Sequence, residues 1–71
     1  MERENVNSSN LASVGYDEEN QVLEIAFNHG GIYQYDNVPQ DTYNGLMNAS
    51  SHGQYFDKYK KKEGYPFRKI R

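Results

Sequence analysis

The residues best suited to chemistry lie near the C-terminus, where cationic side chains alternate with aromatic rings. The cations are Lys58, Lys60, Lys61, Lys62, Arg68, Lys69 and Arg71, and the interleaved aromatic residues are Tyr55, Tyr59, Tyr65 and Phe67. Cations bind phosphates with release of counterions, and aromatic faces stack on unpaired bases. The pattern favours a contact with nucleic acid or another polyanion through these cations and Tyr59. The ordinary alternative is a solvated helix face followed by a solubilising tail.

The formal charges are distributed unevenly, although the 71 residues carry a net charge of only −2. Residues 1–57 hold nine acids and one base, whereas residues 58–71 hold seven bases and one acid. If the tail folds back beside the basic helix, all seven cations share one side of the molecule. The acids could instead neutralise them, and the net negative charge opposes long-range attraction of a polyanion. Opposite charges on the two halves predict either a monomer or a weak, salt-sensitive self-association.

Ser51, His52 and Gly53 form a second candidate site, at the expected start of a helix. Free N–H groups and a partial positive charge at such an end can hold an anion. The alternative is a helix hairpin capped by its own serines. Ser51 and His52 are not expected to act as nucleophile and base, because adjacent helical residues do not face each other.

The other titratable residues indicate neither a metal site nor a catalytic one. His29 lies in an expected turn and His52 at a helix start, so a turn or capping role is expected for each. The acidic residues 17–19 could bind a hard cation weakly, but a solvated turn is the simpler interpretation. The chain has no cysteine, and Gly30-Gly31 lacks the lysine and hydroxyl of a phosphate-binding loop. We therefore expect no metal, no cofactor and no enzymatic activity.

These candidates need a scaffold, and the hydrophobic periodicity predicts an α+β fold. Alternating residues predict strands over 11–16, 22–28 and 32–36, separated by a polar turn and a Gly-Gly turn. Together the strands would form a three-stranded antiparallel meander. Leu23 and Ile25 then share the core face, and Glu24 takes the other face, because a carboxylate in the core is costly.

The period changes after Pro39 and predicts a two-helix hairpin. An i, i+3, i+4 spacing over residues 43–47 marks one apolar helical face, and residues 51–54 match a capping box at the start of the second helix. A short extended segment or edge strand follows over 65–70, since Pro66 excludes a central strand.

Aromatic residues are the expected source of the core, because only 35% of the chain is hydrophobic. Phe27, Tyr33 and Tyr35 could form a stacking platform on the sheet. The simpler interpretation is that they face the core beneath the helices, Tyr35 in particular.

A chain of this length builds one domain. We expect it over residues 8–70, with a frayed, polar N-terminus over residues 1–7. No stretch predicts a transmembrane helix or a signal peptide, so we expect a cytoplasmic protein that does not contact a membrane.

An ordered set of short motifs resembles the KTSC domain family. The matching segments are Ser8–Leu11, Val14–Asp17, Leu23–Phe27, Gly31–Tyr35, Val38-Pro39 with Tyr43, Ala49–Phe56 and Tyr65–Phe67. The resemblance implies an α+β domain of a kind found in short bacterial and phage proteins and at the C-terminus of some lysyl-tRNA synthetases. It implies no established activity, and the lysine run is not one of its motifs.

Two functions remain open from the sequence. The first is a small, non-enzymatic binding module that contacts RNA or another polyanion through the basic C-terminal helix and tail. The alternative is a protein-interaction or regulatory module of bacterial or phage origin, in which the acidic half or exposed aromatic residues contact a partner.

Overall fold

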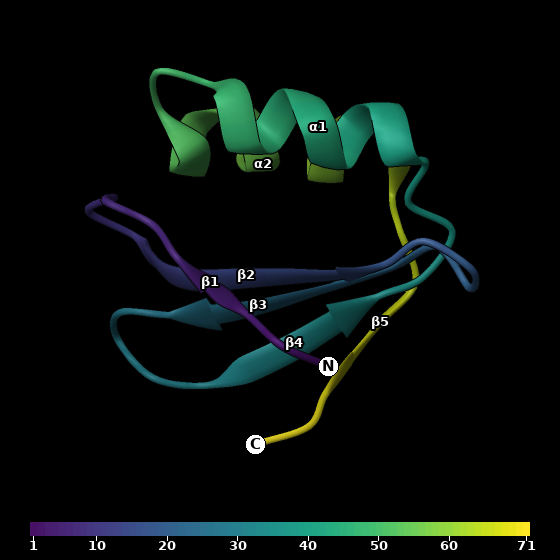
Figure 1. Ribbon diagram of the computed structural model, residues 1–71, viewed down its shortest axis with the longest axis horizontal. Helices are drawn as coiled ribbons and strands as arrows, with labels where there is room; N and C mark the ends of the chain where they lie inside the picture. Colours follow the sequence, from purple (N-terminus) through teal and green to yellow (C-terminus); the bar gives the residue numbers. More distant parts are fainter.

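The computed structural model describes residues 1–71 and has two layers, a sheet and a pair of helices on one of its faces (Figure 1). The sheet is antiparallel throughout, with strand order β1-β2-β3-β4-β5. The elements are β1 (Glu4–Asn5), β2 (Leu11–Asp17), β3 (Val22–Phe27), β4 (Ile32–Tyr35), α1 (Gln40–Asn48), α2 (His52–Glu63) and β5 (Phe67–Lys69). The predicted α+β class and helix hairpin are confirmed, and the predicted meander is extended by β1 and β5. Neither helix has the length and apolar character that crossing a membrane requires.

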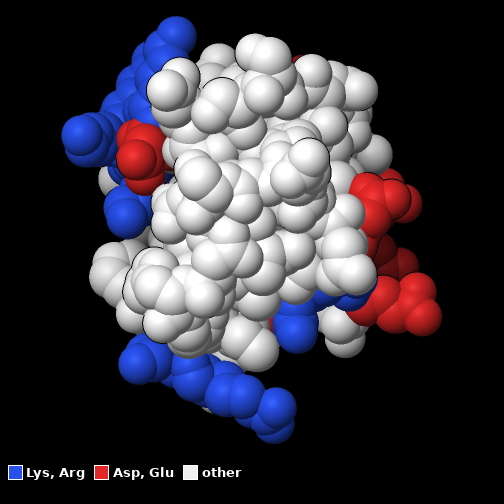
Figure 2. Space-filling view, turned by 90° about the vertical axis from the view of Figure 1, so that its left-hand side faces the viewer, with Lys and Arg blue, Asp and Glu red and all other residues white.

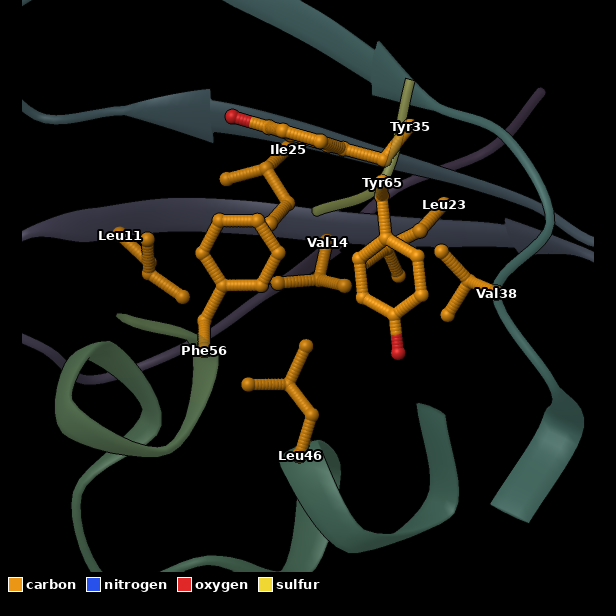
Figure 3. Packing of buried hydrophobic residues seen from close by; sticks show 9 residues of the cluster. All are labelled: Leu11, Val14, Leu23, Ile25, Tyr35, Val38, Leu46, Phe56 and Tyr65. Atoms are coloured by element: carbon orange, nitrogen blue, oxygen red, sulfur yellow. The ribbon is translucent and has the colours of Figure 1, made fainter. Parts of the chain in front are cut away.

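The core lies between the sheet and the helices (Figure 3). Leu23 and Ile25 are completely buried on the helix side of β3, as their alternation predicts. Leu46 from α1 and Phe56 from α2 close the core from the other layer. The nine buried apolar side chains are Leu11, Val14, Leu23, Ile25, Tyr35, Val38, Leu46, Phe56 and Tyr65.

The start and the end of α2 lie where the local sequence predicts them. The Ser51 side chain accepts a hydrogen bond from the Gln54 backbone N–H at 3.4 Å and caps the start of α2. Gly64 adopts the left-handed conformation, φ +60°, that ends α2. The helices approach closely at Gly45, where an added Cβ would lie 1.9 Å from the Tyr55 hydroxyl oxygen. Gly45 therefore makes room for a side chain of α2.

The N-terminus differs from the expectation of a frayed segment over residues 1–7. Residues 4 and 5 form β1, which pairs with β2 at the edge of the sheet. Arg3 beside it makes an ion pair with Glu24 on the face of the sheet away from the helices. Glu24 is only 4% exposed, and it also accepts a hydrogen bond from the Gln34 side-chain amide at 2.8 Å. The segment is held at the sheet because the buried carboxylate on β3 needs the cation that it supplies.

The C-terminal tail forms an edge strand, one of the two predicted forms. It runs along β4 rather than beside α2, with Tyr35 opposite Phe67 and Tyr33 opposite Lys69. Backbone bonds from the Asp36 N–H to the Pro66 carbonyl, 2.9 Å, and from the Ile70 N–H to the Ile32 carbonyl, 2.8 Å, fix both ends of this pairing.

Candidate functional site

The helix lysines, defined as Lys58, Lys60, Lys61 and Lys62, are all exposed on α2. Three of them stand in the last turn, where the helix dipole favours positive charge. The Lys62 ammonium also lies 5.9 Å from the centre of the Tyr59 ring, within the range of a cation–π contact. Part of this basic run therefore stabilises α2 itself, and the rest of its charge faces solvent.

The tail cations, defined as Arg68, Lys69 and Arg71, are divided by the alternation of β5. Lys69 is paired opposite Tyr33 and stands on the helix side of the sheet. A Cβ added to Gly31 would lie 3.1 Å from Tyr33 Cε1 and 3.7 Å from Lys69 Cε, so both side chains pass close to this glycine. Arg68 takes the opposite face, where its Nη1 donates to Oδ2 of Asp36 at 2.7 Å.

The seven cations form two groups, because the condition for gathering them on one side, a tail folded back beside the helix, is not met. Figure 2 shows basic side chains over α2 and a second basic group at the C-terminal end, with uncharged surface between them. The groups are apart because the tail pairs with β4 and not with the helix.

Most of these cations are not neutralised by the acids of the chain. The structure contains two ion pairs, Arg3–Glu24 and Arg68–Asp36. Six of the seven C-terminal cations therefore have no carboxylate within ion-pair distance. Many acidic side chains instead gather at the right-hand margin of Figure 2, away from both basic groups.

A groove of about 350 Å³ opens between α2 and the β4–β5 edge of the sheet. We call it the aromatic groove, and its lining residues are Asn10, Phe27, His29, Tyr33, Tyr35, Asp57, Lys60 and Phe67. Lys60 belongs to the helix lysines, and Lys69 of the tail cations adjoins Tyr33. Lys60 thus lines the groove on the α2 side, and Lys69 on β5 lies next to the groove residue Tyr33.

The rings in the groove contact one another as a continuous layer. Tyr33 lies 5.6 Å from Phe27 in an edge-to-face arrangement and 6.1 Å from Phe67. Phe67 lies 5.8 Å from Tyr35, and His29 caps the other end of the layer, 5.5 Å from Phe27. Phe67 is 62% exposed, whereas Tyr35 is 3% exposed. The Phe67 ring is therefore accessible to a ligand at the β5 end of the groove, whereas the Tyr35 ring forms its buried floor.

Tyr35 is the buried floor of the groove. Burial, together with the negative charges that Tyr33 and Asp57 would bring, raises the pKa of the Tyr35 phenol to about 12. The predicted core role of Tyr35 is confirmed, and its ring packs edge-to-face on Phe56 at 4.8 Å. The phenol stays neutral at physiological pH and adds no charge to the groove.

The structure gives the predicted aromatic partners of the cations different roles. Tyr65 is buried in the core, and Tyr59 is half-buried, with its ring 4.7 Å from that of Tyr55. Only Phe67 of that set lies in the groove. Tyr33 and Phe27 also line the groove, half-buried and packed against the core as the simpler interpretation expects, and the stacking platform stays a prediction. The sequence did indicate that Phe27 and Tyr33 lie close together, because they flank Gly30-Gly31 and a tight turn places the two adjoining strands side by side.

Ser51, His52 and Gly53 join the two helices. A carbonyl oxygen can only accept, so the contact of His52 Nδ1 with the Leu46 carbonyl oxygen, 2.8 Å, makes Nδ1 the donor. This bond ties the start of α2 to the end of α1. With Ser51 acting as the cap, both side chains have structural roles, as the capping alternative expects. The anion site at this helix end stays a prediction.

The remaining candidates for metal or cation binding are dispersed. No group of three or more His, Asp or Glu side chains could enclose a metal ion. Oδ1 of Asp17 accepts from the backbone N–H groups of Glu19 and Asn20, and its Oδ2 accepts from the Asn20 amide at 2.9 Å. These hydrogen bonds lower the pKa of Asp17 below its usual value, and those from Asn20 contribute most. Asp17 thus ends β2 and holds the exposed turn that follows at residues 18–20, in line with the simpler expectation of a turn.

Comparison with known proteins identifies the scaffold that carries this groove. The family model of the KTSC domain matches residues 7–65. The chain belongs to the KTSC domain family. The crystal structure of a KTSC domain protein from Yersinia pestis superposes with a TM-score of 0.92 at 41% identity, covering 99% of this KTSC domain and 97% of that chain.

Two relatives show the settings in which the domain occurs. An uncharacterised protein of Stutzerimonas stutzeri is 39% identical to this chain over 70 residues. The match covers 99% of this chain and 99% of that protein. A lysine–tRNA ligase of Nostoc punctiforme is 38% identical over 49 residues, which are 69% of this chain and 9% of the ligase. The predicted resemblance is confirmed, and residues 66–71, including the tail cations, lie outside the family match.

Proposed function

We propose that this KTSC domain is a small, non-enzymatic binding module for nucleic acid, RNA in particular, that acts in the cytoplasm. The observation that carries the proposal is the set of six C-terminal cations without an ion-pair partner, one of which, Lys60, lines the aromatic groove while another, Lys69, is paired opposite the groove residue Tyr33. Unpaired cations are able to release counterions when they bind phosphates, and this release drives binding to nucleic acid.

The separation of the cations into two groups favours an extended polyanion over a compact anion. A nucleic acid strand could contact the helix lysines and the tail cations with successive phosphates. Many acids gather away from both basic groups (Figure 2), although Asp57 lines the groove and Glu63 stands on α2 beside the helix lysines. RNA is the favoured ligand because a relative of this domain is a segment of a lysine–tRNA ligase.

Binding of a tRNA and of a single-stranded RNA, measured by fluorescence anisotropy between about 50 and 200 mM salt, tests this proposal. The double variant Lys60→Gln/Lys62→Gln should weaken binding and reduce the salt slope by about one to two. Its matched control, Gln40→Glu/Asn44→Glu on exposed positions of α1, lowers the net charge equally but should leave most of the affinity intact.

Two results would contradict the proposal. One is the absence of binding to either RNA at tens of micromolar protein and about 50 mM salt, because even non-specific binding reaches about 10⁻⁴–10⁻⁶ M at physiological salt. The other is an equal loss of affinity in both double variants, because net charge and not the position of the lysines would then govern binding. Protein partners that persist after nuclease treatment, without RNA binding, would favour the protein-interaction alternative.

A further inference from the structure

The exposure of the aromatic layer is not explained by the fold. Phe67 leaves 62% of its surface in water, although Tyr35 directly opposite it on β4 is buried. Phe27 and Tyr33 are half-buried in the same layer. Together these rings form a contiguous apolar surface beside α2, and such surfaces commonly mark a ligand site.

We infer that the aromatic groove binds an unpaired nucleobase, which stacks on Phe67 and Tyr33 while its flanking phosphates contact Lys60 and Lys69. This inference rests on the proposed function and adds the ligand class: single-stranded nucleic acid. The charges argue for this occupant, because Lys60 and Lys69 beside the groove can hold the phosphates that flank a base, whereas an apolar peptide has no group that needs them. Stacked bases inside a duplex cannot reach these rings, so a duplex is excluded from the site.

The polar lining suits the edge of a base. The Asp57 carboxylate accepts hydrogen bonds, and the Asn10 amide can both donate and accept. Exocyclic amino groups and ring nitrogens of a stacked base would supply the complementary groups. A phosphate placed on Asp57 would be repelled, which directs phosphates outward to the lysines and the base inward.

The experiment compares a short single-stranded RNA, the blunt duplex of the same sequence, and inorganic polyphosphate as a polyanion without bases. Phe67→Ala removes the exposed ring, and Ile70→Ala is its matched control, an apolar residue 46% exposed on the same tail. Phe67→Ala should weaken single-strand binding by roughly tenfold, the size expected for one base–aromatic stack. Its duplex and polyphosphate affinities and its salt slope should not change, and Ile70→Ala should match the wild type throughout.

Phe67→Trp gives a second readout, because the chain contains no other tryptophan. Its fluorescence should be quenched by the single strand and not by polyphosphate, with affinity at least equal to that of the wild type. Circular dichroism of each variant confirms that the sheet is intact.

The outcomes separate the inference from the proposed function. Equal affinities of Phe67→Ala and Ile70→Ala for the single strand would overturn the base-stacking site while leaving nucleic-acid binding in place. So would equal wild-type affinities for single strand and duplex. Failure to bind any RNA would overturn both.

Discussion

The buried ion pair between Arg3 and Glu24 makes a sharp prediction about the N-terminus. Replacement of Arg3 by Met keeps the apolar stem of the side chain but removes its charge. Glu24 then loses the Nη1 donor, and the Ser13 hydroxyl loses the Nε donor that lies at 3.0 Å. The carboxylate must either stay buried with only Gln34 as partner or become hydrated by displacement of β1.

The structure sets the size of the effect. A hydrogen bond to a charged group contributes about 1.5–3 kcal/mol. The Arg3 side chain is 29% exposed and that of Glu24 is 6% exposed, so solvent screening reduces the loss to about 1–2 kcal/mol. For a domain of this size, that loss lowers the melting temperature by roughly 5–15 °C.

The pH dependence of this loss follows from the pKa of Glu24. Burial alone raises that pKa, but the hydrogen bonds from Gln34 and Arg3 and the charge of Arg3 outweigh burial and lower it. A carboxyl with a lowered native pKa stabilises the fold above its unfolded value and loses that contribution as the pH falls through the native value. The difference between wild type and Arg3→Met is therefore largest near neutral pH and shrinks in acid, once Glu24 is protonated.

Urea unfolding at pH 7 and at about pH 2 measures this difference directly. Arg68→Met is the matched control, because the Arg68–Asp36 pair is exposed at 49% and 35% and should contribute about 0–1 kcal/mol. A loss in Arg3→Met no greater than that in Arg68→Met, or a loss independent of pH, would refute the role assigned to the N-terminal segment.

Three further predictions concern packing, ionisation and assembly. Gly45→Ala should destabilise the fold, because the added Cβ clashes with the Tyr55 hydroxyl. In a Tyr55→Ala background the same change should stabilise the fold, because the clash is gone and Ala has the higher helix propensity. Thermal unfolding of the four proteins measures the sign of each change. Because the pKa of Tyr35 is about 12, stability should fall as the pH rises from about 10 to 12, and a Tyr35→Phe variant should lack this part of the alkaline loss, as measured by urea unfolding. Sedimentation should show either a monomer or an association that high salt dissolves, and a dimer stable in high salt would contradict the charge-based expectation.

The fold was predictable where alternation and turn chemistry act locally. The spacing of Leu23 and Ile25, the Gly30-Gly31 turn and the Ser51 cap each determine their element over a few residues, and the structure confirms them. The β1 strand was not predictable in this way. Its two polar residues have no periodicity, and its place depends on a long-range pair between Arg3 and Glu24.

The candidate site was predictable only in composition. The sequence identifies the cations, but their division into two groups depends on whether the tail packs against β4 or against α2. The rings of the aromatic groove come from β3, β4 and β5, and their exposure depends on how far α2 covers the sheet. Alternation places Tyr33 and Tyr35 on the same face, yet only the helix position decides that Tyr35 is buried and Tyr33 is partly open.

An NMR titration with a short single-stranded RNA tests the central claim most directly. The account predicts that the aromatic resonances of Phe27, Tyr33 and Phe67 shift together with the amides around Lys60 and Lys69, while those of the acidic turn at residues 17–20 stay unchanged. Shifts confined to the exposed helix lysines, with the aromatic resonances unmoved at saturation, would contradict the claim that the aromatic groove receives a base.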